Sequence, residues 1–449
     1  MRPLVRYARQ FGQFQRNARL YLISNALGGV SVGMILVLYN LYLSALGYRA
    51  DFVGAILFVG TLGAGLAIFP AGVCVDRFGG KAVQIGASLL LGVIAAGQIL
   101  FRQPTLLLLS GFSVGVVGAA LLVVNAPYLT ANSTPAERSH LFSLNIVVYL
   151  ITSVLGRVLG GALPVWFRGT SWLMAPLPSW LNWVLVPQPE QRAYQLALLF
   201  AGIIAMPSII PLFFMSDDRP ARVPGQAPKQ MGDLTRDILA RVREWRRRIT
   251  VRTVLVMTRS AVFLFTLIWA LIGLGAGLFI PYLNLYFVKH LGASSWIFGL
   301  IDGAATALTA LSTLAAPWLA ARLGKIKAIA LAQLASIPLL VALGPASILP
   351  LVVLLYLLRQ SLMDMPMGLL QVFSMEVVPG ERRGLANSSY QAVYQVAWAI
   401  SAPIGGLIIV QFGYSLIFLL AAICYLLAVG TLWRGFGGVV EVRPKSEVP

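Results

Sequence analysis

A few ionisable side chains stand inside long apolar stretches of the sequence. They are Arg157, Asp302, Arg359, Asp364 and Glu376. A charge in apolar surroundings is costly unless it is paired, so each is a candidate for ion pairing, for carrying a proton or for contact with a charged solute. We take these five side chains as the first candidates for chemistry in this chain.

Two of these residues lie close together in the sequence. Arg359 and Asp364 are five residues apart, which places them about 140° apart around a helix. We therefore expect only one of the two side chains to face an internal cavity. The alternative is that the two charges merely neutralise each other or neighbouring helix ends.

Neutral polar and aromatic residues in the same stretches can supply hydrogen bonds and stacking to a solute, or can serve only to bind neighbouring helices. The candidates of this kind are Asn40, Asn284, Tyr394, Gln395 and Trp398. The two histidines lie singly near the ends of stretches, and the sequence has no Walker A, G-x-S-x-G or metalloprotease motif. We expect no enzyme, no metal site and no cofactor, while coupling to a proton or another ion stays open.

The stretches that hold these residues are long enough to cross a membrane. Of 449 residues, 58% are hydrophobic and 11% charged, against roughly 25% charged in an ordinary soluble domain. About 17 apolar residues suffice for a helix to cross the hydrocarbon core, so the composition predicts an all-α integral membrane protein. Twelve stretches reach that length, at residues 20–46, 52–75, 82–101, 105–131, 140–167, 191–215, 262–289, 297–320, 328–344, 349–377, 385–411 and 415–434.

A polar segment divides the twelve stretches into two groups of six. The segment carries a pattern typical of an amphipathic basic helix that lies on an anionic membrane surface. The expected parts are a basic arm at 1–19, a six-helix bundle at 20–215, a linker at 216–260, a second six-helix bundle at 261–434 and a tail at 435–449.

The distribution of basic residues predicts the orientation in the membrane. The chain has a formal net charge of +19, and 27 of its 34 Lys and Arg residues fall in the segments on the side of the N-terminus, against 5 on the other side. Because basic loops stay in the cytoplasm, both termini are expected there, in a multi-pass protein of the plasma membrane. The charge then faces anionic headgroups at the cytoplasmic surface, and we expect no nucleic-acid partner.

The two groups of six share residues at a nearly fixed spacing. Such a duplication predicts two bundles of like topology, with a path for a solute along the axis between them. The segments that recur 244 positions later are 39–43 at 283–287, 135–138 at 379–382, Gly29 at Gly273 and Gly33 at Gly277.

The strongest local motif lies between the second and third stretches, where residues 72–81 read G-V-C-V-D-R-F-G-G-K. It resembles motif A of the major facilitator superfamily, G-x-x-x-D-[RK]-x-G-[RK]-[RK], with Gly80 at a position that is usually basic. The corresponding segment of the second half, 317–325, lacks the acid. The resemblance implies twelve transmembrane helices as two pseudo-symmetric six-helix bundles, and secondary transport by alternating access.

Motif A is expected to form a gate at the cytoplasmic surface. Gly72 permits close helix packing and Gly79 a tight turn, with Arg77 and Lys81 beside it. Asp76 can then pair with Arg138, and the resemblance implies that this contact holds the cytoplasmic side shut in the outward-open state. The alternative is a structural turn with an ordinary interfacial ion pair.

The resemblance also assigns the charges inside the membrane. Because the fifth and eighth helices of the superfamily meet, Arg157 and Asp302 are expected to form an ion pair that can break, or else a permanent structural one. The tenth helix lines the cavity, so Arg359 is our first candidate for a substrate contact and Asp364 for a protonatable coupling group. Glu376 is expected to pair with Arg322 at the inner surface.

The lining of the cavity indicates the class of solute. The middle of the first helix offers only Ser31, and that of the fourth only Ser113, so an apolar wall favours a lipophilic or amphipathic compound. We expect a bacterial exporter of such a small molecule, working as a monomer. One alternative is uptake or exchange of an organic anion through Arg157 and Arg359. Another is a scaffold or receptor that does not transport.

Overall fold

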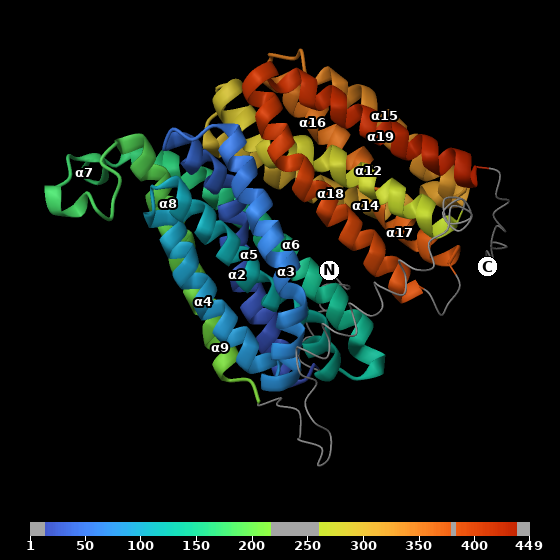
Figure 1. The fold of residues 1–449 in the computed structure, drawn as a ribbon, viewed down its shortest axis with the longest axis horizontal. Helices are drawn as coiled ribbons and strands as arrows, with labels where there is room; N and C mark the ends of the chain where they lie inside the picture. Colours follow the sequence, from blue (N-terminus) through green and yellow to red (C-terminus); the bar gives the residue numbers. More distant parts are fainter. Residues whose placement is uncertain (1–13, 217–259, 379–382, 438–449) are drawn as a thin grey trace, which may run out of the picture. The chain divides into compact units, whose positions relative to one another are not determined.

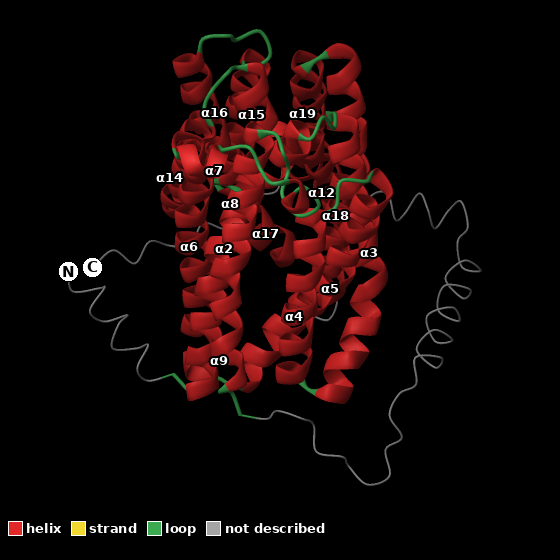
Figure 2. Ribbon diagram, turned by 90° about the vertical axis from the view of Figure 1, so that its left-hand side faces the viewer, coloured by secondary structure: helices red, strands yellow, loops and turns green. Residues whose placement is uncertain are grey.

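The computed structural model describes residues 14–216, 260–378 and 383–437, and all regular secondary structure in these residues is helical (Figure 2). Twelve helices of the described part are long and apolar enough to cross a membrane. This confirms the twelve predicted spans. The predicted linker helix, most of the basic N-terminal arm and most of the C-terminal tail lie outside the described residues.

The first half of the chain contributes six candidate membrane spans, the sixth of which consists of α8 (Pro189–Ala205) followed by two helical pieces of four residues each. Figure 1 shows these helices in blue to green. The helices are α2 (Arg16–Ala45), α3 (Ala50–Phe78), α4 (Gly80–Leu100), α5 (Pro104–Ala131), α6 (Pro135–Gly169), α7 (Ser171–Met174), η1 (Ser179–Leu181), α8 (Pro189–Ala205), η2 (Met206–Ile209) and α9 (Ile210–Phe213).

In the second half, two of the six spans are interrupted near a proline. Pro281 and Pro366 lack the amide hydrogen that would continue the helix, and helices end at Phe279 and Asp364 just before them. The elements are α12 (Ala261–Phe279), η3 (Ile280–Tyr282), α13 (Leu283–Leu285), the π-helical turn η4 (Tyr286–His290), α14 (Ser295–Leu323), α15 (Lys325–Ala342), α16 (Leu349–Asp364), α17 (Met367–Glu376), α18 (Arg383–Phe412) and α19 (Tyr414–Phe436).

The chain forms two compact units. Of the described residues, unit 1 takes 14–47, 59–216 and 294–300. Unit 2 takes 48–58, 260–293, 301–378 and 383–437. The division differs from the two expected bundles in that the beginning of α3 groups with unit 2, and the beginning of α14 with unit 1.

The recurrence at 244 residues in the sequence is matched by equivalent contacts inside each unit. In unit 1, the Tyr42 hydroxyl donates to the carbonyl oxygen of Ile99 at 2.7 Å. In unit 2, the Tyr286 hydroxyl donates to the carbonyl oxygen of Leu343 at 2.6 Å. Both donors and both acceptors are 244 positions apart, so the two units repeat one packing arrangement as well as one sequence pattern.

Glycines allow the central helix of each unit to approach its neighbour. α2 packs on α6, where a Cβ at Gly33 would collide with the backbone of Ser153 and Gly156. α12 packs on α18, where a Cβ at Gly277 would collide with Ser401 and with the backbone of Trp398. Small residues of this kind are what lets membrane helices pack closely, because no hydrophobic force drives them together within lipid.

We therefore expect Gly33→Ala and Gly277→Ala each to lower the free energy of unfolding, by about 1–3 kcal/mol, the usual cost of overpacking. The matched control is Gly118→Ala in α5, since a Cβ there would meet nothing within 4 Å and alanine is the better helix former. Thermal unfolding of the three variants in detergent checks this. Equal melting temperatures for all three would contradict the role of these two glycines.

Candidate functional site

The motif A turn joins α3 to α4 within unit 1. Gly79 adopts φ +84°, a conformation open to glycine, and its amide hydrogen bonds the Val75 carbonyl oxygen at 2.9 Å. Lys81 follows at once and donates from Nζ to the carbonyl oxygen of Met215, past the end of α9. The guanidinium of Arg77 lies 5.4 Å from the centre of the Phe78 ring. The turn therefore joins three parts of the unit.

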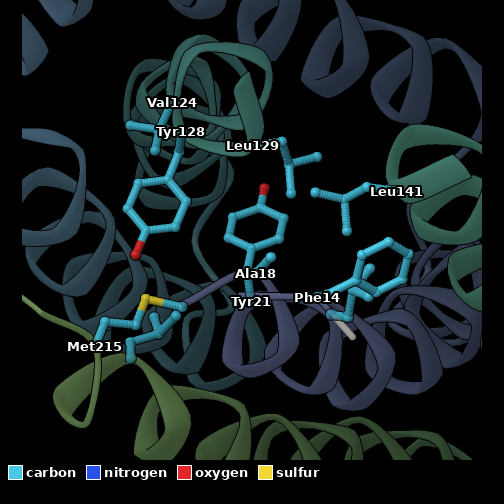
Figure 3. Packing of buried hydrophobic residues seen from close by; sticks show 10 residues of the cluster. Phe14, Ala18, Tyr21, Val124, Tyr128, Leu129, Leu141 and Met215 are labelled. Atoms are coloured by element: carbon cyan, nitrogen blue, oxygen red, sulfur yellow. The ribbon is translucent and has the colours of Figure 1, made fainter. Parts of the chain in front are cut away.

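Asp76 faces a small cavity beside this turn. The cavity has a volume of about 140 Å³ and is also lined by Gly80, Pro127 and Tyr128. Tyr128 belongs to a buried cluster of α2, α5, α6 and the chain after α9, in which its ring stacks on Tyr21 with centroids 5.6 Å apart (Figure 3). The carboxylate of the motif thus borders both the turn and the packed end of the unit.

The expected pairing of Asp76 with Arg138 is not formed in this structure. Arg138 instead bonds the end of α5, through Nε to the Ser133 hydroxyl at 3.4 Å and through Nη2 to the Thr130 carbonyl oxygen at 3.3 Å. Among the described residues, no ion pair joins Arg138 to Asp76. Gly72 also departs from expectation, since a Cβ there would meet nothing within 4 Å and no close helix packing depends on it.

A cavity of about 580 Å³ lies between α3, α4 and α5 of unit 1. α3 lines it with Ala67, Cys74 and Phe78, α4 with Gly86 and α5 with Val116, among others. No charged side chain of the described part of the chain lines it. Such a lining suits the hydrocarbon portion of a ligand and offers little to a sugar or an ion.

Unit 2 holds a cluster of polar and charged side chains around Arg359 of α16. The side chain of Arg359 is 1% exposed, and its guanidinium lies 4.7 Å from the ring centre of Phe279 in α12 and 5.3 Å from that of Tyr425 in α19. Such cation–π contacts are strongest where the cation is removed from water. The arginine is therefore fixed between helices of its own unit.

Gln360 joins the two charges of this cluster, a role that the sequence reasoning did not assign. Nη1 of Arg359 donates to Gln360 Oε1 at 2.7 Å, and Gln360 Nε2 donates to Asp364 Oδ2. The spacing of four residues between Gln360 and Asp364, one turn of helix, is the signal that could have indicated it. Tyr394 of α18 packs edge-on against Trp269 of α12, with ring centres 6.0 Å apart.

The other predicted residues have contacts of their own, or their pairing stays open. Asp302 accepts a hydrogen bond from the Tyr356 hydroxyl at 3.3 Å within unit 2. Arg157 belongs to unit 1, so its pairing with Asp302 stays a prediction. Asn284 is buried, and its side-chain oxygen accepts from the amide of Leu285 at 2.9 Å. Of the remaining three, Asn40 is half-buried in α2. In α18, Gln395 is exposed and Trp398 is half-buried.

The predicted pair of Arg322 with Glu376 is replaced by another. Lys325, the first residue of α15, bonds both carboxylate oxygens of Glu376, at 2.5 and 2.6 Å from Nζ. Arg322 instead lies over the ring of Trp318, 4.3 Å from its centre. The tryptophan is one helical turn before Arg322 on the same helix, which brings the two side chains together.

Both the sequence and the structure of the chain resemble those of known proteins. The family model described as Major Facilitator Superfamily matches residues 21–377 and 267–449. No curated protein sequence matches the chain.

Solved transporters share the fold at low sequence identity. A bacterial homologue of the iron transporter ferroportin, in an inward-facing state, is 17% identical with a TM-score of 0.67, covering 94% of this chain and 98% of its own. The nucleoside transporter NupG is 13% identical with a TM-score of 0.66, and the match covers 94% of this chain and 99% of NupG. A D-xylose–proton symporter is 15% identical with a TM-score of 0.65, and the match covers 93% of this chain and 97% of the symporter. These likenesses show the fold.

The motif A turn gives one prediction. Asp76→Asn is expected to keep the fold but to raise the maleimide labelling rate of a cysteine at Ala131, an exposed residue beside the Asp76 cavity. The reason is the gating role that the family resemblance implies for this carboxylate. The measurement uses a chain with Cys74→Ala and Cys424→Ala. The matched control is Asp51→Asn, which removes an acid at the other end of the same helix. An unchanged labelling rate in Asp76→Asn would contradict the gate.

The charged cluster around Arg359 in unit 2 gives a second prediction. We expect Arg359→Met to lower the free energy of unfolding by about 3–5 kcal/mol, because it leaves the Asp364 carboxylate without its compensating charge. Adding Asp364→Asn to Arg359→Met should recover part of that loss, and chemical denaturation in detergent measures both. Strictly additive effects of the two changes would show that the charges do not interact.

Proposed function

The chain belongs to the major facilitator superfamily and is a multi-pass membrane protein, and from that premise we propose that it is a secondary transporter that exports a lipophilic or amphipathic small molecule by alternating access. The division of the chain into two compact units, with equivalent tyrosine hydrogen bonds in each, supports this proposal. We further propose that it works in the plasma membrane of a bacterium-like cell, with both termini in the cytoplasm.

The cavity between α3, α4 and α5 is the observation that carries the proposed substrate class. Its volume of about 580 Å³ falls within the range of sites for small molecules, and its lining is apolar. Ser31 and Ser113, the polar groups expected in the middle of the first and fourth helices, add few hydrogen-bonding groups for a solute. Ser113 is occupied with the carbonyl oxygen of Leu109 in its own helix, and Ser31 is buried.

The motif A turn supports the proposal of a gated cycle. Its acid, Asp76, borders a cavity. Among the described residues, the arginine with which the family resemblance pairs it makes two long hydrogen bonds, of 3.3 Å to Thr130 and 3.4 Å to Ser133. Because those bonds are weak, Arg138 is able to exchange them for the stronger pairing with a carboxylate. We propose that this exchange accompanies closure of the cytoplasmic side.

The charged cluster of unit 2 is our candidate for coupling to a proton. Asp364 is compensated by Arg359 through the Gln360 amide, so protonation of Asp364 would free the arginine from its partner. The close packing of Arg359 against two rings argues for this positioning role over direct contact with the solute. The proposed partners are then the solute, the coupling ion and anionic headgroups at the cytoplasmic face.

The alternative of organic-anion uptake or exchange would use Arg157 and Arg359 to bind the anion. The burial of Arg359, with 1% of its surface exposed, favours the lipophilic solute over this alternative. A scaffold or receptor without transport activity is the alternative of another class. A static protein has no use for a gating acid, and for this reason we place transport first.

Ligand-dependent melting of the purified protein at two pH values tests the proposed substrate class. We expect cationic amphiphiles to raise the melting temperature, since a ligand at about 100 times its dissociation constant adds about 2.7 kcal/mol. Stabilisation by carboxylates or phosphates alone would support the anion alternative, and no stabilisation by a broad panel would support the scaffold.

Cys74 provides a direct readout of the cavity, because it is exposed and lines it. In a Cys424→Ala background, a stabilising amphiphile is expected to slow maleimide labelling of Cys74. A cysteine at Leu122, an exposed residue of α5 outside the lining, is the matched control and should be labelled at an unchanged rate in a Cys74→Ala, Cys424→Ala chain. Equal slowing at both sites would point to a general detergent effect.

A further inference from the structure

The segment between α6 and α8 exposes three tryptophans. The exposed fractions are 75% for Trp172, 67% for Trp180 and 79% for Trp183. No charged residue occurs between Arg168 and Glu190, which bracket the segment. An exposed group of large aromatic side chains without neighbouring charge is unusual for a surface in water and marks a site of interaction.

A buried arginine holds this segment in shape. Arg192 of α8 is 1% exposed and donates to the carbonyl oxygens of Leu173 at 3.0 Å, Ala175 at 2.7 Å and Val186 at 3.1 Å, as well as to that of Pro187. Its acceptors come from both ends of the segment. Among the described residues, Arg192 has no carboxylate partner, so its donors are used to fix the path of the backbone.

Two further side chains fix the second half of the segment. The Gln195 amide accepts from the Val186 amide hydrogen at 2.8 Å and donates to the Val184 carbonyl oxygen at 2.9 Å. Arg102, which lies between α4 and α5, donates to the Leu185 carbonyl oxygen at 2.9 Å. The tryptophans therefore stand on a preformed platform that loses little conformational entropy when it binds a surface.

The platform lies at one end of the membrane-crossing helices of unit 1. It projects to the side from the ends of α6 and α8 in Figure 1, and Figure 2 shows α7 at the same level beside α8. At its base, Arg168 and Glu190 form an ion pair of 3.7 Å, and the Arg168 guanidinium lies 5.0 Å from the ring centre of Tyr194. Charges at the two helix ends place this level at the boundary between hydrocarbon and water.

We propose that residues 170–188 form a rigid platform that inserts its three tryptophans into the phospholipid headgroup boundary at this end of the protein. Indole rings favour that boundary because their bodies are apolar and their N–H groups can bond lipid carbonyls or water. The absence of charge in the segment favours lipid over a protein surface rimmed with polar groups. Arg192 is a positioning residue for this contact, which is independent of the proposed transport activity.

Depth-dependent fluorescence quenching in nanodiscs tests the proposal. Trp180→Cys, in a chain with Cys74→Ala and Cys424→Ala, is labelled with the fluorophore NBD and mixed with phospholipids that carry a nitroxide near the headgroup or deep in the acyl chain. We expect the shallow nitroxide to quench several-fold more than the deep one, and iodide in the water to quench little. A cysteine at Leu66, 63% exposed within α3, is the control and should show the reverse order of the two nitroxides.

Two results would overturn the proposal. Strong quenching by iodide with none by either lipid would place the segment in water. Quenching by neither lipid nor iodide would place it against protein, and dependence of the emission on the number of copies in each disc would identify a second copy of this chain.

The role of Arg192 is tested with the same label at position 180. Arg192→Met is expected to lower the fluorescence anisotropy and to reduce the contrast between shallow and deep quenchers. Gln195→Leu serves the same purpose if Arg192→Met does not fold. Unchanged anisotropy and contrast in a folded variant would show that the platform does not depend on these side chains.

Discussion

The close approach of a central helix to its neighbour is the interaction on which the rest of this structure depends. In lipid, helices gain nothing from hiding apolar surface, so their packing rests on backbone contact between small residues. α2 meets α6 at Gly33, and α12 meets α18 at Gly277, 244 positions later. Each unit therefore contains an equivalent close contact between two helices. Two compact units with equivalent helix contacts are what the proposed alternating access requires of the fold.

Two buried arginines fix parts of the structure that lie outside the glycine contacts between helices. Arg359 is packed between aromatic rings and linked by Gln360 to Asp364, so the two charges are held in one hydrogen-bonded cluster inside unit 2. The guanidinium of Arg192 binds different acceptors: it donates to backbone carbonyl oxygens of the loop between α6 and α8 and so fixes that loop. In both cases the arginine is buried and bonded to neighbouring groups of its own unit, which is why we propose positioning roles for both.

The sequence predicts the helices better than the contacts between their side chains. The twelve spans follow from the length of apolar runs, and the recurrence at 244 residues agrees with the matching bonds of Tyr42 and Tyr286. The partner of Glu376 could not be predicted, because the choice between Arg322 and Lys325 depends on how each helix is rotated and how far each side chain reaches. The spacing of Gln360 and Asp364 was compatible with a bridge, but the contact of Gln360 with Arg359 and the loop contacts of Arg192 were visible only in three dimensions.

Alternating access by the two units is the central claim, and distance measurements between paired spin labels test it most directly. One label replaces Ala131 of unit 1 and the other Gln371 of unit 2, in a chain without native cysteines and reconstituted in nanodiscs. We expect at least two distance populations whose ratio changes with a stabilising ligand or with Asp76→Asn, while a pair within unit 1, at Ala131 and Leu66, keeps one distance. A single distance between the units, unaffected by both changes, would contradict alternating access.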